Sequence, residues 1–533
     1  MLAFALTSRE LRLGSVCFDL TQAQALPPLS AITDGDDHRP VEVEWPAAEE
    51  WLSAVRESPA VAFPEGEARP FRLSETWLYL ERFWSEEAMV ARHLARRAKL
   101  ASPPTLTPAI PAGVGPAPDA GQSAAVAAAV RNWTTVITGG PGTGKTTTVG
   151  SLLTQLNDPE RTLLVALAAP TGKAAARLEA SVAEHGVGDL NLQISGGTLH
   201  GLLGVVPGRS SRDFHRGNPL PQDLIIVDET SMVSLSMMSW LLDAVSDTTR
   251  LILVGDPHQL ESVEAGSVLA DIASGVLGDR GPAVAELTHN WRSQANITAL
   301  AEAIRTGRAE DAVDLATGDQ DCTLESFDGT QPLADFASMV ASVVEQAEQV
   351  QQAAQQGDGS GALRLLERHR LLCAHREGPF GLSRWAGAVR SLLGTELSGF
   401  AGDRRSYPGQ PLLITRNSHL ANNGDTAVVV RRGDDLVAWV DRPDGPLGVD
   451  PSVLDHTSEL FAMTIHKSQG SQFDEVSVVL PPIGSPLLTR ELLYTAITRA
   501  KRRVRIIGSP EALISAVRTP TRRVSGLGRA AGA

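Results

Sequence analysis

The sequence predicts an α/β protein built on parallel β-sheets, and two observations lead to this prediction. From about Gly121 onward, short apolar runs alternate with helix-like stretches, which is typical of parallel strands joined by helices. A glycine-rich loop that ends in lysine and threonine stands between the first of these runs and a helix-like stretch. The runs are TTVIT, LLVALAAP, DLIIVDE and RLILVGD and, much later, FDEVSVVLP and RRVRIIG.

Composition limits the size, the compartment and the charge of the protein. A chain of 533 residues exceeds what one hydrophobic core usually serves, so we expect several domains. No apolar run is long enough to span a bilayer and the N-terminus lacks a secretion signal, so we expect a cytoplasmic protein. The formal net charge of -15 means that any basic surface for nucleic acid must be local. The scattered Cys17, Cys322 and Cys373 are expected to be buried small hydrophobes.

The two ends of the chain differ from the α/β pattern. The segment up to about Leu100 predicts a small helical domain, which ends in an amphipathic helix with Leu78 and Leu94 on its apolar face. The stretch from Ala101 to Gly121 is rich in proline and small residues, so we expect a linker there. The closing segment VRTPTRRVSGLGRA is basic and contains glycine, and one alternative is that Arg522 and Arg523 belong to an ordinary solvated tail.

Two segments interrupt the later α/β pattern. Apolar residues from Asp335 to Gln356 recur at helical spacing, and the following QQGDGSGA predicts a flexible loop. Between Gly409 and Leu460 short strands alternate with the turns NNGD, RRGDD and RPDGP. This pattern predicts a small β-barrel inserted into the second α/β unit.

The glycine-rich loop GGPGTGKT satisfies the GxxxxGK[ST] pattern in its proper context after a strand. Its glycines let backbone N–H groups close around phosphates, while Lys145 would meet the outer phosphates and Thr146 would ligate Mg²⁺. The residues expected to bind ATP are Gly139, Gly140, Pro141, Gly142, Thr143, Gly144, Lys145, Thr146 and Thr147.

A pair of carboxylates follows the strand in DLIIVDETSM, at the edge of the sheet where α/β proteins bind ligands. Asp228 would hold Mg²⁺ directly or through water, and Glu229 would orient and deprotonate the attacking water. The alternative is an acidic pair that caps a helix. Together with the glycine-rich loop, the pair predicts a nucleoside triphosphatase, but not what it acts on.

Later motifs narrow the class by resemblance. VGDPHQLESV, LTHNWRS, FAMTIHKSQGSQFDEV and ELLYTAITRAKRRV occur in order and resemble helicase motifs three to six of superfamily one. PTGKAAARL, DETSMV and PLLITRNSHLANNGDTAVVV resemble the RecD family within that superfamily. The resemblance covers about Leu78 to Arg529.

The resemblance implies roles for four more residues at the nucleotide. Gln259 would sense the terminal phosphate, and Arg292 and Arg499 would reach it from the second motor domain. Guanidinium groups that arrive across a cleft would stabilise the transferred phosphoryl group and make hydrolysis depend on closure. Gln122 would read the adenine edge, or else it caps a helix.

The resemblance also implies a path for DNA across both motor domains. Contacts to the backbone of a single strand would let the motor ignore base identity. Gly470 would permit a close approach. The residues implied are Thr171, Lys173, Thr198, His200, Thr464, His466, Lys467, Ser468 and Gln469. Each could instead be a solvated loop residue.

The implied architecture is two RecA-like domains, a helical N-terminal domain and an inserted SH3-like β-barrel. The implied segments are a partner-docking domain with the start of the linker at 1–105, motor domain 1A at 106–283, the first part of motor domain 2A at 284–408, the barrel at 409–460, and the rest of 2A with the tail at 461–533.

The function implied is ATP-driven 5′-to-3′ movement on DNA, as one subunit beside RecB-like and RecC-like chains that process double-strand ends. The sequence shows no separate constellation of carboxylates and lysine for DNA cleavage, so cleavage would belong to a partner. Two alternatives stay open. The chain could be a stand-alone repair or conjugation helicase, or an ATP-binding subunit with a mainly structural role.

Overall fold

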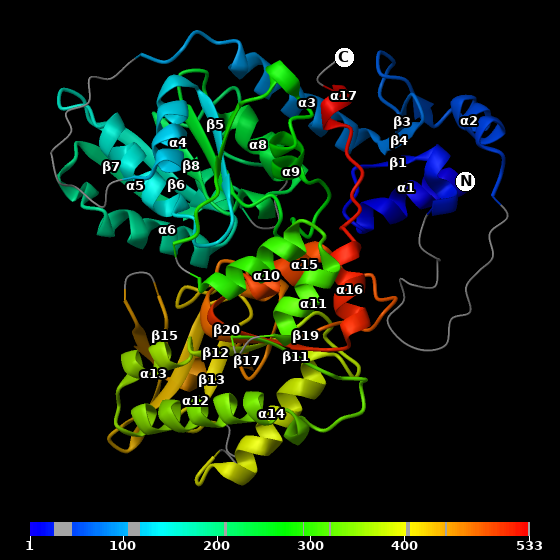
Figure 1. The fold of residues 1–533 in the computed structure, drawn as a ribbon. Helices are drawn as coiled ribbons and strands as arrows, with labels where there is room; N and C mark the ends of the chain where they lie inside the picture. Colours follow the sequence, from blue (N-terminus) through cyan, green and yellow to red (C-terminus); the bar gives the residue numbers. More distant parts are fainter. Residues whose placement is uncertain are drawn as a thin grey trace.

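The computed structural model describes residues 1–25, 45–104, 118–206, 211–291, 293–318, 321–400, 406–442 and 445–530. Two α/β units lie one above the other in Figure 1, with a smaller N-terminal domain beside the upper unit and an inserted sheet within the lower one. None of the helices in these ranges combines the length and apolar character needed to cross a membrane.

The first unit is a six-stranded parallel sheet in the order β10-β5-β9-β8-β6-β7. Its strands are β5 (Thr134–Gly139), β6 (Leu163–Ala169), β7 (Leu192–Thr198), β8 (Leu224–Val227), β9 (Arg250–Gly255) and β10 (Ala283–Leu287). Four of them confirm the apolar runs that predicted strands. Because β10 pairs with β5, the predicted domain boundary between residues 283 and 284 is wrong, and the first unit extends at least to Leu287.

Helices cover both faces of this sheet, and each face has its own hydrophobic core. They are α4 (Ala120–Arg131), α5 (Lys145–Leu156), α6 (Gly172–Glu184), α7 (Leu199–Leu202), α8 (Leu235–Ala244) and α9 (Val268–Ala273), with the short turns η3 (Val187–Asp189), η4 (Thr230–Met232) and η5 (Gly278–Arg280). Because β9 lies between β5 and β8 and all three are parallel, the loops that follow these strands meet at one edge.

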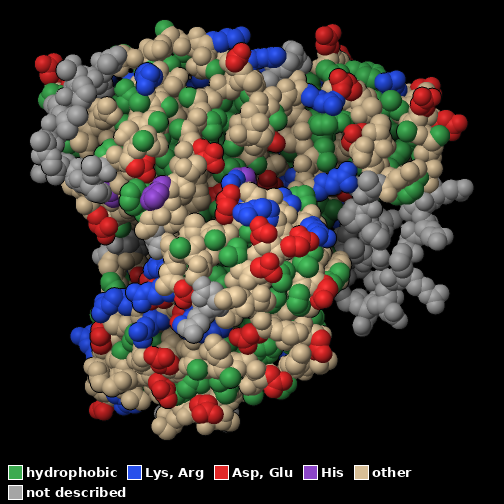
Figure 2. Space-filling view, viewed as in Figure 1, with side chains coloured by type: hydrophobic (Ala, Val, Ile, Leu, Met, Phe, Trp, Pro, Cys, Tyr) green, Lys and Arg blue, Asp and Glu red, His purple; other side chains and the backbone are tan. Residues whose placement is uncertain are grey.

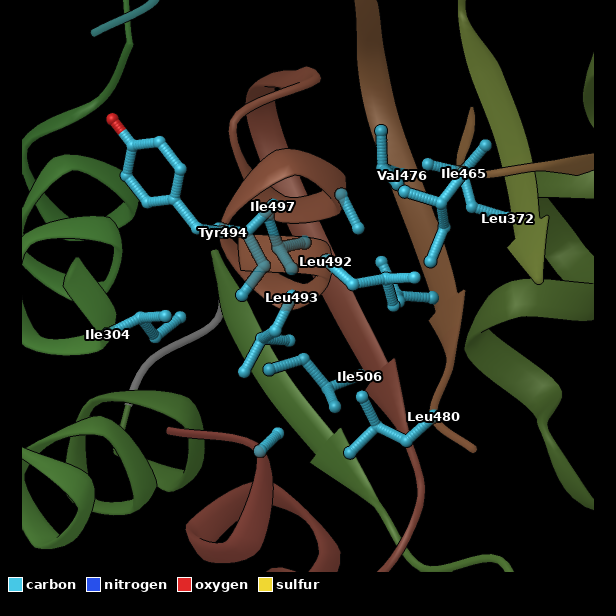
Figure 3. Packing of buried hydrophobic residues seen from close by; sticks show 14 of the residues in the cluster. Ile304, Leu372, Ile465, Val476, Leu480, Leu492, Leu493, Tyr494, Ile497 and Ile506 are labelled. Atoms are coloured by element: carbon cyan, nitrogen blue, oxygen red, sulfur yellow. The ribbon is translucent and has the colours of Figure 1, made fainter. Parts of the chain in front are cut away.

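The second unit is a five-stranded parallel sheet in the order β11-β20-β19-β12-β18. Its strands are β11 (Cys322–Glu325), β12 (His369–Cys373), β18 (Met463–Thr464), β19 (Phe473–Val479) and β20 (Ala500–Ile507). Its helices are α10 (Ala295–Arg305), α11 (Ala309–Thr317), α12 (Ala337–Gln355), α13 (Gly359–Leu365), α14 (Leu382–Glu396), α15 (Arg490–Ile497) and α16 (Pro510–Arg518), with η6 (Leu333–Asp335) and η8 (His466–Ser468). Figure 3 shows part of its core, where side chains of α15 pack against β19 and β20.

The helix expected between residues 335 and 356 is confirmed as α12, but the flexible loop expected after it is wrong. Asp358 accepts a hydrogen bond from the Gly361 N–H at 2.8 Å and begins the short helix α13. A cap of this kind stabilises a helix start even where the composition is rich in glycine.

The inserted segment forms a five-stranded antiparallel sheet in the order β16-β15-β14-β13-β17. Its strands are β13 (Pro411–Ile414), β14 (Thr426–Arg432), β15 (Asp435–Val440), β16 (Leu447–Val449) and β17 (Thr457–Glu459), with η7 (Pro451–Val453) between the last two. The β-rich insertion is therefore confirmed, and its SH3-like character stays a prediction.

The N-terminal domain contains helices and a four-stranded sheet, so the prediction of a small helical domain is wrong in omitting the sheet. Its four-stranded sheet has the order β1-β4-β3-β2, from β1 (Cys17–Asp19), β2 (Val61–Ala62), β3 (Phe71–Ser74) and β4 (Trp77–Leu80). Its helices are α1 (Leu2–Arg12), η1 (Leu20–Ala25), α2 (Ala48–Arg56) and α3 (Glu81–Ala98). Leu78, which the sequence placed on the last helix, lies in β4. Residues 105–117 of the expected linker lie outside the described ranges.

The three cysteines are buried, as expected. The basic C-terminal segment is not a solvated tail. After α16 the chain returns to the N-terminal domain, where α17 (Leu527–Ala530) packs on α3 and α9 (Figure 1). Arg523 in this segment has a side chain only 13% exposed.

The buried Glu87 on α3 predicts a pH dependence of stability. Burial raises the pKa of Glu87 to about 7, against hydrogen bonds from Ser525 and Gly526 that favour the carboxylate. The folded protein therefore holds this proton more tightly than the unfolded chain, so this contribution to stability falls as the pH rises from the unfolded pKa near 4.5 to about 7.

We expect Glu87→Gln, which keeps an acceptor without the charge, to lose less thermal stability than the wild type between about pH 5 and about pH 8. Thermal unfolding across this range measures the effect. Glu310→Gln, at a carboxylate whose side chain is 68% exposed, is the control and should follow the wild type. Equal pH profiles for Glu87→Gln and the wild type would contradict the expectation.

Candidate active site

The glycine-rich loop after β5 has a backbone that only glycine tolerates at several positions. Gly142 and Gly144 adopt φ of 84° and 80°, in the left-handed region. A Cβ on Gly139 would lie 2.6 Å from the Thr143 hydroxyl oxygen and 2.9 Å from the Leu287 carbonyl. The loop therefore delivers the N-terminus of α5, with its unpaired N–H groups, to the edge of the sheet where anions bind.

Lys145 opens α5 and folds back along the loop. Its Nζ donates to the carbonyls of Gly139 at 2.6 Å and Gly140 at 3.1 Å. Thr146 follows Lys145, and both residues line a cleft beside the loop. The ammonium group thus lies over the loop that the sequence predicts to hold phosphates.

The carboxylate pair follows β8 and faces this loop across the cleft. Glu229 has φ of 50°, and its N–H donates to the Asp228 carboxylate at 2.8 Å. Burial and the neighbouring Glu229 raise the pKa of Asp228, and Lys145 opposes them. Glu229 stands at the start of η4, but its side chain makes no capping hydrogen bond, so the helix-cap alternative is not supported.

One cleft of about 130 Å³ brings these groups together with residues of the second unit. From the first unit it is lined by Lys145, the carboxylate pair and Gln259, and from the second by Gly470, Gln472 and Arg499. The second unit contributes the segments that precede β19 and β20, so the cleft lies where the two parallel sheets face each other.

Arg499 is buried at the base of this cleft and connects the two units. Its guanidinium donates to the side-chain oxygen of Gln259 at 2.9 Å, and Gln259 donates to Asp256 at 3.0 Å. It also donates to the Thr495 and Ser471 carbonyls of its own unit. Burial lowers the pKa of Arg499, while Glu229 opposes this shift. The predicted Arg292 lies outside the described residues.

Tyr494 joins the core of the second unit to the cleft. Figure 3 shows its ring beside the packed side chains of α15 and its hydroxyl pointing away from them. Burial raises its pKa well above the ordinary value, and Asp256 adds to this rise. A Cβ on Gly140 would lie 2.9 Å from the hydroxyl, so the phosphate-loop backbone rests against Tyr494.

Two side chains at or beside the cleft were not predicted from the sequence. Arg177 on α6 donates to the Gly470 carbonyl at 2.8 Å and to Gln472 at 3.1 Å, which ties the first unit to the second. The Trp291 side chain is 62% exposed and its ring contacts His289, while its backbone N–H donates to the Gly142 carbonyl at 2.9 Å. Arg177 stands one helical turn after Lys173, but only the fold shows that it faces the cleft. An exposed indole beside the phosphate loop gives a nucleotide base a surface on which to stack.

Gln122 has two alternative roles predicted from the sequence, which are adenine recognition and helix capping. Its side-chain oxygen accepts from the Asp119 N–H at 3.0 Å, while its own N–H donates to Asp119 at 2.7 Å, which is a capping box for α4. Its amide nitrogen also reaches the Gly144 carbonyl at 3.5 Å. The capping alternative therefore describes this conformation, and adenine recognition stays a prediction.

The lysine predicted to meet DNA phosphates lies in a second cleft, of about 380 Å³, under the inserted sheet. Burial lowers the pKa of Lys173, whereas Asp441, Glu367 and Asp425 favour its charged form. Lys173 therefore lies near acidic side chains, of which Asp425 and Asp441 flank strands of the inserted sheet. In Figure 2, Lys and Arg side chains gather along one side of the lower unit and where it meets the upper one, so basic surface is local despite the net negative charge.

The other residues predicted to contact DNA differ in exposure. His200 and Lys467 are exposed, and His466 is half-buried. Thr171 and Thr198 cap α6 and α7 with their hydroxyl oxygens. Thr464 is 7% exposed and Ser468 is fully buried, and the Ser468 hydroxyl donates to the Ile465 carbonyl, so their contacts with DNA stay predictions that this conformation does not favour. Gln469 donates to the Leu260 carbonyl of the first unit at 2.9 Å, and Gly470, with φ of 73°, faces α6.

The donors in the first cleft fit a hard divalent cation. The Thr146 hydroxyl and the Asp228 carboxylate are oxygen ligands, which Mg²⁺ prefers, and both line the cleft beside Lys145. Both neighbour the loop that would carry the phosphates, so a shared ion could bind protein and phosphate oxygens together.

Family comparisons cover the N-terminal domain and parts of both units. Residues 1–79 match the N-terminal domain of RecBCD enzyme subunit RecD, residues 117–322 match an AAA domain, and residues 459–507 match the UvrD-like helicase C-terminal domain.

Individual proteins show the same relationship. RecBCD enzyme subunit RecD of Mycolicibacterium smegmatis is 44% identical over 550 residues, which cover 99% of this chain and 92% of that protein. The ATP-dependent RecD2 DNA helicase of Deinococcus radiodurans is 32% identical over 71% of this chain and 47% of that protein. The Pif1 helicase structure from Candida albicans superposes with a TM-score of 0.42 at 15% identity, over 75% of this chain and 97% of that one.

We expect Trp291→Ala to weaken ATP binding about tenfold, because a stacked aromatic face is lost, and Trp291→Phe to keep most of the affinity. Titration with a fluorescent ATP analogue gives both dissociation constants. Ile483→Ala removes another side chain that is 62% exposed and is the control. Unchanged affinity in Trp291→Ala would show that the indole does not stack on the nucleotide.

Proposed function

Because the chain belongs to the family of RecBCD enzyme subunit RecD, we propose that it is an ATP-dependent DNA helicase and the RecD-type subunit of a helicase–nuclease that acts on double-strand DNA ends. The single observation that carries the proposal is the shared cleft. In this cleft, Lys145 and the carboxylate pair of the first unit lie opposite the buried Arg499 of the second unit.

The geometry supports a cycle in which ATP hydrolysis follows closure of the two units. The loop amides and Lys145 hold the phosphates, and Glu229 orients the attacking water. Arg499 offsets the charge that spreads over the transferred phosphoryl group. Magnesium, held by oxygens of Thr146 and Asp228, would neutralise part of the phosphate charge. Because Arg499 belongs to the second unit, hydrolysis and the relative position of the units depend on each other.

The N-terminal domain favours a subunit over a stand-alone helicase. It matches the RecD N-terminal model, and the 44% identity to a RecD subunit extends over 99% of this chain. We therefore infer RecB-like and RecC-like partners, with residues 1–105 as the docking domain. A mainly structural ATP-binding role is disfavoured, because the cleft brings together Lys145, the carboxylate pair and Arg499, which are groups that hydrolysis uses.

Finer features follow from family membership. We infer RecA-like motor domains, 5′-to-3′ movement on single-stranded DNA, an SH3-like form for the inserted sheet, and action in the cytoplasm. The exposed His200 and Lys467 and the half-buried His466 are the predicted DNA contacts that the described surface favours. A grip on the backbone would make translocation independent of sequence.

The polarity of movement can be measured on partial duplexes. We expect ATP-dependent unwinding of a duplex with a 5′ overhang, by the full chain alone or with its co-purified partners, and little unwinding with a 3′ overhang. A preference for the 3′ overhang would reject the polarity. Large RecB-like and RecC-like chains should co-purify, and their absence would favour the stand-alone alternative.

Lys145→Gln tests whether the cleft drives this activity. The ammonium group contacts loop carbonyls rather than the core, so its loss should leave the fold intact and abolish turnover. ATP hydrolysis with single-stranded DNA is compared for the variant and the wild type, and circular dichroism checks the fold. ATP turnover near the wild-type rate in Lys145→Gln would contradict the assignment of the cleft as the site of ATP hydrolysis.

A further inference from the structure

The C-terminal segment connects parts of the molecule that are far apart in the fold. It leaves the second unit after α16 and ends in α17, which packs on α3 and α9 beside the N-terminal domain (Figure 1). We call residues 519–530 the strap. The second unit is thereby tied to the first unit and to the N-terminal domain by one continuous segment.

Arg523 is the polar centre of the strap. Its guanidinium forms an ion pair with Glu261 at 2.9 Å, and it donates to the carbonyls of Ser262 at 2.7 Å and Glu264 at 3.2 Å. Both charged side chains are largely buried, 13% and 14% exposed. A planar guanidinium can bind a carboxylate and several carbonyls at once, whereas a lysine ammonium cannot reproduce that geometry.

The loop that Arg523 holds is the one that follows Gln259. At its start, the Leu260 N–H donates to the Thr495 hydroxyl at 2.8 Å, and its carbonyl accepts from Gln469 at 2.9 Å. These contacts fix the loop to the second unit directly beside the Arg499–Gln259 bond. The residues from Leu260 to Gly266 thus join the nucleotide cleft at one end to the strap at the other.

The N-terminal domain rests on the same loop. The Gly266 N–H donates to the Gly14 carbonyl at 3.0 Å, and the Val16 N–H donates to the Val524 carbonyl of the strap at 2.7 Å. A Cβ on Gly14 would lie 2.5 Å from the guanidinium carbon of Arg523. Loop, strap and N-terminal domain therefore contact one another around a single side chain.

The far end of the strap has a fixed register on the N-terminal domain. The Ser525 hydroxyl and the Gly526 N–H donate to the buried Glu87 at 2.8 and 2.9 Å. A Cβ on Gly526 would lie 1.9 Å from the Tyr79 hydroxyl, and the Arg529 guanidinium lies 4.2 Å from the Trp77 ring centre. The strap therefore cannot slide along this domain without breaking buried contacts.

We propose that Arg523 is a positioning residue for ATP hydrolysis, which holds the Leu260–Gly266 loop so that the Gln259–Arg499 contact depends on the N-terminal domain. The inference rests on the proposed function, because it assigns a coupling role within the same motor. A partner protein that shifts the N-terminal domain acts through Gly14 and Arg523 on the loop beside the nucleotide. The coupling is a free energy shared by the two sites, so nucleotide binding also acts on the N-terminal domain.

The test measures DNA-stimulated ATP hydrolysis of the full chain for Arg523→Ala, Gln259→Ala and the double variant. We expect Arg523→Ala to lower kcat about fivefold and to leave KM for ATP within about twofold, because it misplaces Gln259 without touching the nucleotide. If Arg523 acts through Gln259, it should lower kcat little further in the Gln259→Ala protein. Arg518→Ala, at an exposed ion pair on α16, is the matched control and should behave as the wild type.

The outcomes separate this inference from the proposed function. A wild type without DNA-stimulated hydrolysis overturns the proposed function and this inference with it. If the wild type is active, two results overturn the inference alone. Either kcat of Arg523→Ala equals that of the wild type, or the effects of the two single variants on kcat multiply in the double variant. If Arg523→Ala does not fold, Arg523→Lys decides. Lysine keeps the positive charge but lacks the planar set of donors of the guanidinium, so we expect a reduced kcat at unchanged KM. A wild-type kcat in Arg523→Lys would contradict the proposal.

Discussion

The hydrogen bond from Arg499 to Gln259 is the contact on which the two α/β units depend. Both side chains are almost fully buried, so neither could lose its partner to water without a desolvation cost. Arg499 is fixed by carbonyls of its own unit, and Gln259 is fixed by Asp256. Any change in the distance between the units must therefore break or re-form this hydrogen bond. The two units are thus expected to occupy discrete relative positions, with the bond either made or broken.

The sequence predicted those parts of the fold that have a strong local signal. The runs that became β5, β6, β8, β9, β19 and β20 are rich in β-branched and other apolar residues, which is typical of buried parallel strands. Strand β7 contains two glycines just before its last residue, and the N-terminal strands have two to four residues, which are too few to show a period. Short strands of this kind form because of tertiary pairing, which a single sequence does not display.

The candidate site divides in the same way. The phosphate loop and the carboxylate pair are contiguous motifs, so their chemistry could be predicted before the fold was known. Arg177 lines the cleft and Trp291 lies against the phosphate loop only because segments distant in sequence meet there. Burial is another property that the motif does not display: the Ser468 hydroxyl, which was predicted to contact DNA, donates to the Ile465 carbonyl within its own turn.

The inserted sheet enters and leaves the second unit at neighbouring points. Strands β13 and β17 pair antiparallel, and the Leu460 N–H donates to the Pro411 carbonyl at 3.0 Å. With both ends side by side, the insertion can change in length without moving β12 and β18 apart. Strand β14 packs on α12 and α13, so evolution could enlarge the outer strands β15 and β16 most easily, while β14 keeps the insertion attached to the second unit.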